Sequence, residues 1–284
     1  MTVDEAIAEG SAALGNDAES ARRDARLLVG NVLARTAAWM LANGDAVLAD
    51  VDVARYRAAI RRRAGGEPIA YILGHVGFYG RTFAVTPDVL VPRPETEQLV
   101  ARTLETFAGD RALRFCDVGT GSGAIALTLA AERPRASVVA IDVSAAALAV
   151  AARNAAALRV GERITFRLED ALENLERDMV FDAIVANLPY VRSSALASKP
   201  DPTSFEPRLA LDGGRDGLGP YRKLLRRAPD HLARNGLLLM EAGPDKSEEL
   251  AELALRALGG VGWVRILRDY AGLRRIVELR ATPG

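Results

Sequence analysis

The sequence contains very little of the residue types that bind metals or form covalent cross-links. Cys116 is its single cysteine, and its two histidines, His75 and His231, lie far apart in 284 residues. One cysteine cannot form an internal disulfide, which fits a reducing compartment. Because neither histidine has a cysteine or a second histidine near it in the sequence, we expect no metal site.

The chain also lacks a net charge and a long hydrophobic run. Lys plus Arg and Asp plus Glu both number 37, so the formal net charge is zero. Non-specific nucleic-acid binding needs an excess of cationic surface, so we expect no direct nucleic-acid partner. No apolar run approaches bilayer length, and the N-terminus has no basic region followed by an apolar one. We therefore expect a soluble, cytoplasmic protein with no membrane partner.

Nearly half of the residues are apolar, which is enough for a sizeable core. Residues 1–65 show helical spacing of apolar positions, and Ser20 is placed to cap the second of three expected helices. We interpret this segment as a small helical bundle, either a lid or a substrate-docking module, and favour docking. Residues 66–93 alternate Tyr, Ile, Phe and Val with Gly, which predicts a hairpin linker.

From residue 94 to residue 284 the pattern alternates between helix and strand, which is typical of a mostly parallel sheet covered by helices on both faces. Seven strands are expected near 113–118, 136–141, 163–168, 181–186, 236–241, 263–269 and 274–280. Helices are expected near 95–107, 123–132, 144–158, 218–234 and 245–258. The last two strands leave no room for a crossover helix, so we expect a hairpin that adds one antiparallel strand. The pattern predicts an α/β fold.

A glycine-rich loop follows the first of these strands. It reads Gly119-Thr120-Gly121-Ser122-Gly123 and opens a helix-like run. In a strand–loop–helix unit of this kind, backbone N–H groups face a ligand and glycine permits its close approach. Asp142 ends the next strand, about twenty residues further on, where it can accept both ribose hydroxyls of a nucleoside. The loop departs from the dinucleotide pattern, and Asp117 either braces it or caps the helix.

The fourth strand ends on Asn187-Leu188-Pro189-Tyr190. Asn187 offers a side-chain carbonyl, and Leu188 precedes a proline, which biases its backbone toward an extended conformation. Tyr190 supplies a flat face. Two acceptors and a flat face suit a planar amino group, although Asn-X-Pro is also an ordinary way to end a strand in a turn.

The chain combines a glycine loop, an acid at a fixed spacing and the Asn-Leu-Pro-Tyr motif. In this combination it resembles the S-adenosylmethionine-dependent methyltransferases that act on planar amino groups. Three further segments are similar to the HemK/PrmC family of peptide chain release factor glutamine methyltransferases: Gly66-Glu67-Pro68-Ile69-Ala70-Tyr71, Val91-Pro92-Arg93-Pro94-Glu95-Thr96-Glu97 and Phe205-Glu206-Pro207-Arg208 with Gly214-Arg215-Asp216-Gly217. The resemblance implies a Rossmann-like fold, S-adenosylmethionine as cofactor and class I release factors as partners. It implies methylation of N5 of the glutamine in their Gly-Gly-Gln motif.

The resemblance also implies roles for individual residues. Catalytic and substrate-binding roles fall on Asn187, Leu188, Pro189 and Tyr190, with Glu206 pinning the substrate loop or serving only as a turn residue. Cofactor contacts fall on Gly119, Thr120, Gly121, Ser122, Gly123, Asp142, Asp170 and Asn187. The chain departs from the family at Leu188, usually Pro, and at Gly77, usually an acid. Leu188 keeps the backbone carbonyl but adds an N–H that needs a partner.

Two other functions are compatible with parts of the sequence. Asn-Leu-Pro-Tyr also resembles the ribosomal RNA adenine dimethyltransferases, and a retained cofactor-binding fold can serve as a non-catalytic interaction module. The zero net charge and the segment from Pro92 to Glu97 speak against the first alternative. The intact glycine loop, Asp142 and Asn187 speak against the second. The sequence does not identify the preferred release factor or the oligomeric state.

Overall fold

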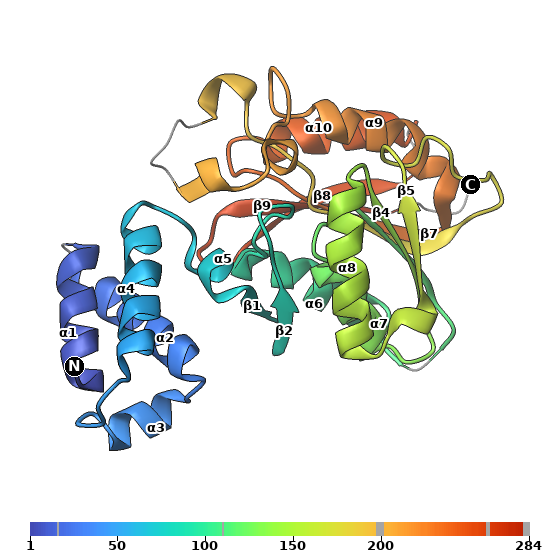
Figure 1. Ribbon diagram of the computed structural model, residues 1–284. Coiled ribbons are helices and arrows are strands. Elements are labelled where there is room, and N and C mark those ends of the chain that lie inside the picture. Colours follow the sequence, from blue (N-terminus) through green and yellow to red (C-terminus); the bar gives the residue numbers. More distant parts are fainter. Residues whose placement is uncertain (16, 110, 197–201, 260–261, 281–284) are drawn as a thin grey trace. The chain divides into compact units, whose positions relative to one another are not determined.

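The computed structural model describes residues 1–15, 17–109, 111–196, 202–259 and 262–280. The chain divides into two compact units (Figure 1). Met1–His75, with the described residues of a later segment at 202–205, forms the N-terminal unit. Val76–Leu196 and the chain from Glu206 onward form the larger unit.

The N-terminal unit is a helical bundle. Its helices are α1 (Val3–Leu14), α2 (Ala18–Leu33), α3 (Ala37–Ala42), α4 (Asp50–Ala64) and α5 (Ile69–Leu73). Tyr56 of α4 is fully buried, and its hydroxyl donates to the carbonyl oxygen of Ala6 at 2.7 Å. A side chain at Gly10 of α1 would collide with that hydroxyl, so the glycine permits the close approach of the two helices.

Three details of this bundle differ from the sequence-based expectation. Helix α5 lies within residues 66–93, which were expected to form only a hairpin linker. Asp17, not Ser20, caps α2, because the Asp17 carboxylate accepts the backbone N–H of Ser20, which already lies inside the first turn. The short helix α3 was not predicted. It begins where the Thr36 hydroxyl accepts the N–H of Trp39 at 3.2 Å, and six residues are too few to show a helical period.

The larger unit is built on a seven-stranded sheet, as expected. Its strands are β3 (Arg114–Val118), β4 (Ser137–Asp142), β5 (Ile164–Leu168), β6 (Phe181–Ala186), β7 (Leu232–Glu241), β8 (Trp263–Arg268) and β9 (Arg274–Arg280). Their order across the sheet is β5-β4-β3-β6-β7-β9-β8. The pairs from β5 to β7 are parallel, whereas β9 runs antiparallel to both of its neighbours. The predicted antiparallel strand is therefore confirmed.

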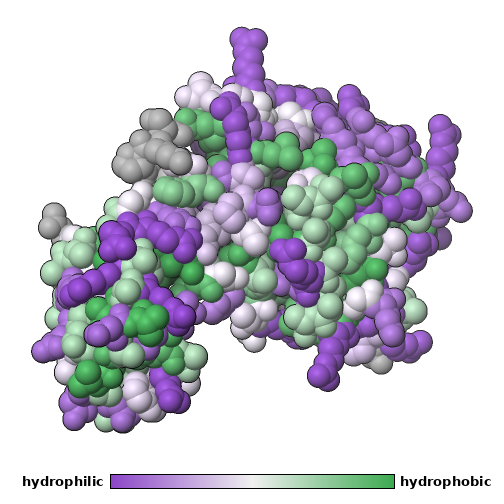
Figure 2. Space-filling model, viewed as in Figure 1, coloured by the Kyte–Doolittle hydropathy of each residue, from purple (hydrophilic) through white to green (hydrophobic). Residues whose placement is uncertain are grey.

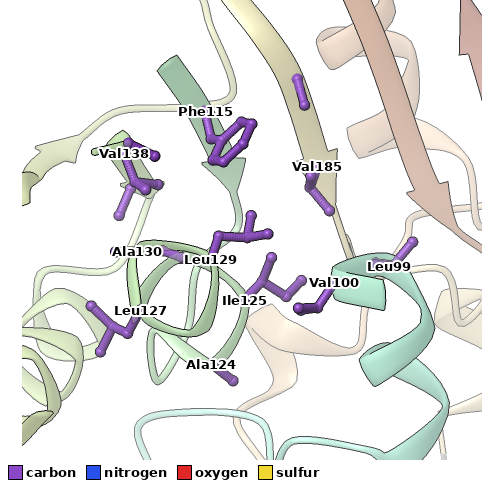
Figure 3. Packing of buried hydrophobic residues seen from close by; sticks show 14 of the residues in the cluster. Leu99, Val100, Phe115, Ala124, Ile125, Leu127, Leu129, Ala130, Val138 and Val185 are labelled. Carbon is purple, nitrogen blue, oxygen red and sulfur yellow. The ribbon is translucent and has the colours of Figure 1, made fainter. Parts of the chain in front are cut away.

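Helices cover both faces of this sheet (Figure 1). They are α6 (Glu97–Thr106), which follows the 3-10 turn η1 (Pro94–Thr96), then α7 (Ala124–Glu132), α8 (Ala145–Leu158), α9 (Gly219–Arg227) and α10 (Ser247–Ala257). Alternate strand residues face opposite layers: Phe115 and Val185 pack with α6 and α7, while Cys116 and Ile184 pack with α9 and α10. Figure 3 shows Ile125 and Leu129 of α7 pointing toward the strands. Cys116 is fully buried, as a small apolar filler should be.

The helix expected at 218–234 is shorter than predicted. It ends at Arg227, and the 3-10 turn η6 (Ala228–His231) leads into β7, which begins at Leu232. Pro229 explains the end of the helix, because proline lacks the N–H for an i→i−4 hydrogen bond and its ring clashes with the preceding turn.

A β-hairpin precedes the sheet, formed by β1 (His75–Phe78) and β2 (Arg81–Ala84). Its turn residues, Tyr79 and Gly80, have φ values of 49° and 72°. The side chain of Asn154 in α8 accepts the N–H of Ala84 at 2.8 Å and donates to the carbonyls of Ala84 and Ser122. One buried amide thus ties the end of the hairpin to the glycine loop.

A substitution at Gly123 would show how tightly α7 and α8 pack beside the glycine loop. Its φ is +84°, and a Cβ there would lie 2.8 Å from Leu127 and 3.2 Å from Ala151. We predict that Gly123→Ala lowers the free energy of unfolding by roughly 2–4 kcal/mol, from left-handed strain plus overpacking. Gly80→Ala is the matched control, because Gly80 is also left-handed but has open space around it. Equal losses for both variants in urea unfolding would contradict the packing argument.

Candidate active site

A cavity of about 350 Å³ lies at the carboxyl ends of β3, β4, β5 and β6. In open α/β sheets this edge is where ligands bind, and the volume is in the range of small-molecule sites. Most of the residues predicted from the sequence line it, namely Gly119, Thr120, Gly121, Ser122, Asp142, Asp170, Asn187, Leu188 and Pro189. Segments far apart in the sequence thus meet in one place.

The glycine loop is held from β4 by Asp142. One carboxylate oxygen accepts the N–H of Gly121 at 2.9 Å, and the other accepts the N–H of Ser144 at 2.8 Å. Burial raises the pKa of this carboxyl. A Cβ on Gly121 would meet no atom within 4 Å, so a ligand can approach the backbone there. Asp142 therefore braces the loop while it lines the cavity.

Asp117 performs both of the roles considered for it. Its Oδ2 accepts the hydroxyl of Thr120 at 2.7 Å and the N–H of Ala126, in the first turn of α7, at 3.0 Å. The side chain is fully buried, and burial raises its pKa to about 7. This carboxylate fixes the glycine loop against the helix that follows it.

Asn187 is oriented by a chain of hydrogen bonds that the sequence did not reveal. Its Nδ2 donates to the Thr96 hydroxyl at 3.0 Å, and that hydroxyl donates to Oε2 of Glu241 at 2.8 Å. Since the hydroxyl proton is committed to Glu241, Thr96 can only accept from Asn187. The carbonyl oxygen Oδ1 of Asn187 has no partner among the described residues and is left for a ligand.

Leu188 is held by Tyr221 of α9. The hydroxyl of Tyr221 accepts the N–H of Leu188 at 3.1 Å and lies 3.1 Å from the Leu188 carbonyl oxygen. It also hydrogen-bonds to the backbone carbonyl of Glu241. The N–H that leucine introduces in place of the family's proline therefore has a partner. A Cβ on Gly119 would lie 2.7 Å from Leu188, so the glycine loop and this motif are in contact.

Three predicted site residues do not line the cavity. Gly123 begins α7. Tyr190 is partly buried and packs against the hydrophobic cluster on the α9–α10 side of the sheet, where burial raises the pKa of its phenol. Glu206 is buried, accepts the N–H of Val91 at 3.0 Å and pairs with Arg93, which does line the cavity. The roles assigned to these three residues stay predictions.

The acids that follow β5 differ in their surroundings. Asp170 lines the cavity but pairs with Lys223, and both side chains are 45% exposed. Its neighbour Glu169 also lines the cavity, and Oε2 of that side chain is buried with no hydrogen-bond partner among the described residues. Sequence reasoning singled out Asp170 and missed Glu169, although both follow the same strand.

Thr96 and Glu241 were also missed. Thr96 lies inside the Pro-Arg-Pro-Glu-Thr-Glu segment, and Glu241 is the one acid at the end of the apolar run Leu237–Met240. A buried acid that ends an apolar strand was the available signal.

Among the described residues no group of three or more His, Cys, Asp or Glu is placed to hold a metal ion. No described helix is long and apolar enough to cross a membrane.

The buried carboxyl of Glu241 predicts a pH dependence of stability. Burial raises its pKa to about 7, above the ordinary value of 4.5, so between these values the folded state keeps a proton that the unfolded state has released. The wild type should therefore lose stability relative to Glu241→Gln as the pH rises from 4.5 to 7, by at most about 1.4 kcal/mol per pH unit. Urea unfolding across this range measures the difference, and parallel curves would contradict it.

Comparison with known proteins identifies the family. Residues 5–74 match the family model described as the PrmC N-terminal domain, and residues 96–199 match the methyltransferase small domain. The release factor glutamine methyltransferase of Moorella thermoacetica is 43% identical over 97% of this chain and 97% of its own. That of Bordetella pertussis is 43% identical over 90% and 93%.

The fold is shared with more distant enzymes. A Thermus thermophilus 16S rRNA N2 G1207 methyltransferase, solved in complex with AdoMet and guanosine, superposes with a TM-score of 0.54 at 19% identity. The match covers 73% of this chain and 49% of that one, and it supports the S-adenosylmethionine-dependent methyltransferase fold alone. Identity above 40% over nearly the whole length goes further: the chain belongs to the PrmC/HemK family of release factor glutamine methyltransferases.

Proposed function

We propose that the protein methylates N5 of the glutamine in the Gly-Gly-Gln motif of class I peptide chain release factors, with S-adenosylmethionine as methyl donor. The observation that carries this proposal is the fixed orientation of Asn187. Its amide nitrogen is committed to Thr96, so its carbonyl oxygen is presented beside the Leu188 backbone at the edge of the cavity. Two acceptors at this place suit the two hydrogens of a primary amide.

The cavity offers open backbone and carboxylate acceptors that suit the cofactor. S-Adenosylmethionine supplies an activated methyl group on a sulfonium centre. The glycine loop offers open backbone at Gly121, and we assign the ribose hydroxyls to Asp142, which lines the cavity. For the exocyclic amine of adenine, the available acceptors are Asp170, as the sequence suggested, and Oε2 of Glu169, which has no hydrogen-bond partner among the described residues. These residues fit the cofactor, and their individual roles are part of the proposal.

Placement is the main chemical task of the residues around Asn187. A carboxamide nitrogen is a poor nucleophile because its lone pair is delocalised into the carbonyl. Oδ1 of Asn187 and the carbonyl oxygen of Leu188 accept the two amide hydrogens and so fix the direction of that lone pair. Positioning can lower a barrier by several kcal/mol, up to about 7–11 in ideal cases. The same acceptors stabilise the positive charge that develops on the nitrogen. No base is needed first, since the alkylated nitrogen is strongly acidic.

Glu206 and Arg93 are proposed to hold the substrate-facing loop. The carboxylate of Glu206 is buried and bonded to the backbone of Val91 and to the side chain of Arg93, both in the segment before η1 that borders the cavity. The contact anchors the chain just before Pro207 and Leu209, which line the cavity. Glu206 therefore acts on the substrate through the loop it pins.

We further propose that the N-terminal unit docks the release factor. Figure 2 shows hydrophobic residues on the surface of this unit. Its exposed large hydrophobic side chains include Leu41, Val47 and Val51, which are 75%, 77% and 55% exposed. Several large apolar side chains exposed on a small unit favour a protein–protein contact role. Recognition should also require the folded release factor, because a free peptide loses roughly 1–2 kcal/mol of backbone entropy per residue on docking.

The cofactor assignment is tested by Asp142→Ala. Loss of a charge-assisted hydrogen bond to the ribose should weaken S-adenosylmethionine binding by about 1.5–3 kcal/mol, which is roughly 10- to 150-fold in Kd. Asp269→Ala is the matched control, because Asp269 is also buried, pairs with Arg275 at 2.9 Å and does not line the cavity. Calorimetry showing the parental Kd for a folded Asp142→Ala protein would sink the assignment.

The reaction itself is tested by Asn187→Ala. The variant should abolish methyl transfer while keeping the fold, because Asn187 lies just beyond the end of β6 and is only partly buried. The assay follows labelled S-adenosylmethionine onto a release factor, with mass spectrometry to locate the label. A release factor with glutamate in place of the Gly-Gly-Gln glutamine should accept no label. Near-parental transfer by Asn187→Ala, or label on ribosomal RNA instead of the release factor, would overturn the proposal.

A further inference from the structure

Both acceptors of the proposed substrate site are connected to a single residue, Glu241. Its carboxylate accepts from Thr96, which accepts from the amide nitrogen of Asn187. Its backbone carbonyl accepts from the hydroxyl of Tyr221, which accepts from the N–H of Leu188. One residue at the end of β7 thus holds the side chain of Asn187 through one arm and the backbone of Leu188 through the other.

The fold places Glu241 where both arms can reach. Ala186 at the end of β6 is paired in parallel register with Met240 of β7, so Asn187, which follows β6, comes beside Glu241, the last residue of β7. Thr96 comes from η1, which leads into α6 on one face of the sheet, whereas Tyr221 comes from α9 on the other face. Thr96, Glu241 and Tyr221 are 4%, 1% and 0% exposed, so water does not compete for these hydrogen bonds.

We propose that Glu241 is a positioning residue, which sets Asn187 Oδ1 and the Leu188 carbonyl as a matched pair of acceptors for the substrate amide. This inference rests on the proposed function. An asparagine amide has an oxygen and a nitrogen of nearly equal size, so an unrestrained side chain could present its N–H groups to the substrate. Thr96 prevents that flip because its own proton is taken by Glu241.

The Tyr221 arm compensates for the loss of a proline ring at position 188. Proline fixes its own φ, whereas leucine leaves that angle free and adds an N–H. The hydroxyl of Tyr221 takes up this N–H and links it to the Glu241 backbone, so the direction of the Leu188 carbonyl is set by a hydrogen bond. The distance between Asn187 Oδ1 and the Leu188 carbonyl oxygen is therefore fixed. A fixed distance is needed because both oxygens must accept hydrogens from the same amide nitrogen of the substrate.

The test compares Thr96→Val and Tyr221→Phe with the wild type, using the full-length chain, labelled S-adenosylmethionine and a folded release factor. Misplaced acceptors should lower kcat roughly 10- to 100-fold. The cofactor Kd from calorimetry and the KM for the release factor should stay within about twofold, because neither residue contributes the proposed ribose or docking contacts. Thr96→Ser retains the hydroxyl and should restore most of kcat.

Thr103→Val is the matched control for a buried threonine. Thr103 lies in α6, is fully buried and donates to the carbonyl of Leu99 in its own helix at 2.8 Å, away from Asn187. It should keep the parental kcat. Thr96→Val leaves the Glu241 carboxylate without its donor, so the double variant Thr96→Val/Glu241→Gln provides an uncharged version that folds more readily. Because both changes break the same arm, the double variant should lose no more kcat than Thr96→Val alone.

Each outcome separates the possibilities. Parental kcat in folded Thr96→Val and Tyr221→Phe, with a wild type that methylates the release factor, overturns the positioning role and leaves the proposed function intact. Losses of kcat and cofactor affinity together, matched by Thr103→Val, indicate a purely structural role and also overturn it. A wild type that transfers no label to the release factor overturns the proposed function, and the role of Glu241 falls with it.

Discussion

The parallel pairing of β3, β4, β5 and β6 is the constraint on which the site depends. Because these strands run in one direction, their carboxyl ends share one edge, and the polar residues at or just beyond those ends meet there. Asp142 and Asn187 each end or follow a strand at that edge. The apolar layers on either side exclude water from the buried hydrogen bonds of Asp117, Thr96 and Glu241, which therefore act in a medium of low dielectric.

This arrangement requires two buried acids, and burying a carboxylate lowers the stability of the folded state. Asp117 and Glu241 are both fully or almost fully buried, and burial raises the pKa of each to about 7. Neither pairs with a cation at salt-bridge distance among the described residues; each instead accepts a threonine hydroxyl, from Thr120 and Thr96 respectively. A neutral donor satisfies a carboxylate only in part. Both acids hold segments that border the cavity, which indicates that stability is given up for geometry at the site.

The sequence was sufficient for the architecture and for the strand ends, because both depend on local patterns. Alternation of helix and strand predicted the seven strands, and the short gap before Arg274 predicted the antiparallel pair. The predicted helix boundaries were wrong where a single residue determines them. Pro229 ends α9 earlier than predicted, and Asp17 instead of Ser20 caps α2. The partners of Asn187 were out of reach for a different reason. Thr96 lies 91 residues away and Glu241 lies 145 residues from Thr96, and no local pattern encodes such contacts.

The departure at Leu188 shows why a family pattern needs the structure beside it. Read alone, leucine for proline removes a rigid ring and leaves a buried N–H, which costs free energy unless it is paired. In the folded protein the N–H is accepted by Tyr221, and the same hydroxyl reaches the backbone of Glu241. The rigidity that proline supplies covalently is replaced by a buried hydrogen bond between β7, α9 and the end of β6. Whether a substitution in such a motif is tolerated therefore depends on what the opposite helix offers, and in this chain α9 offers a hydroxyl.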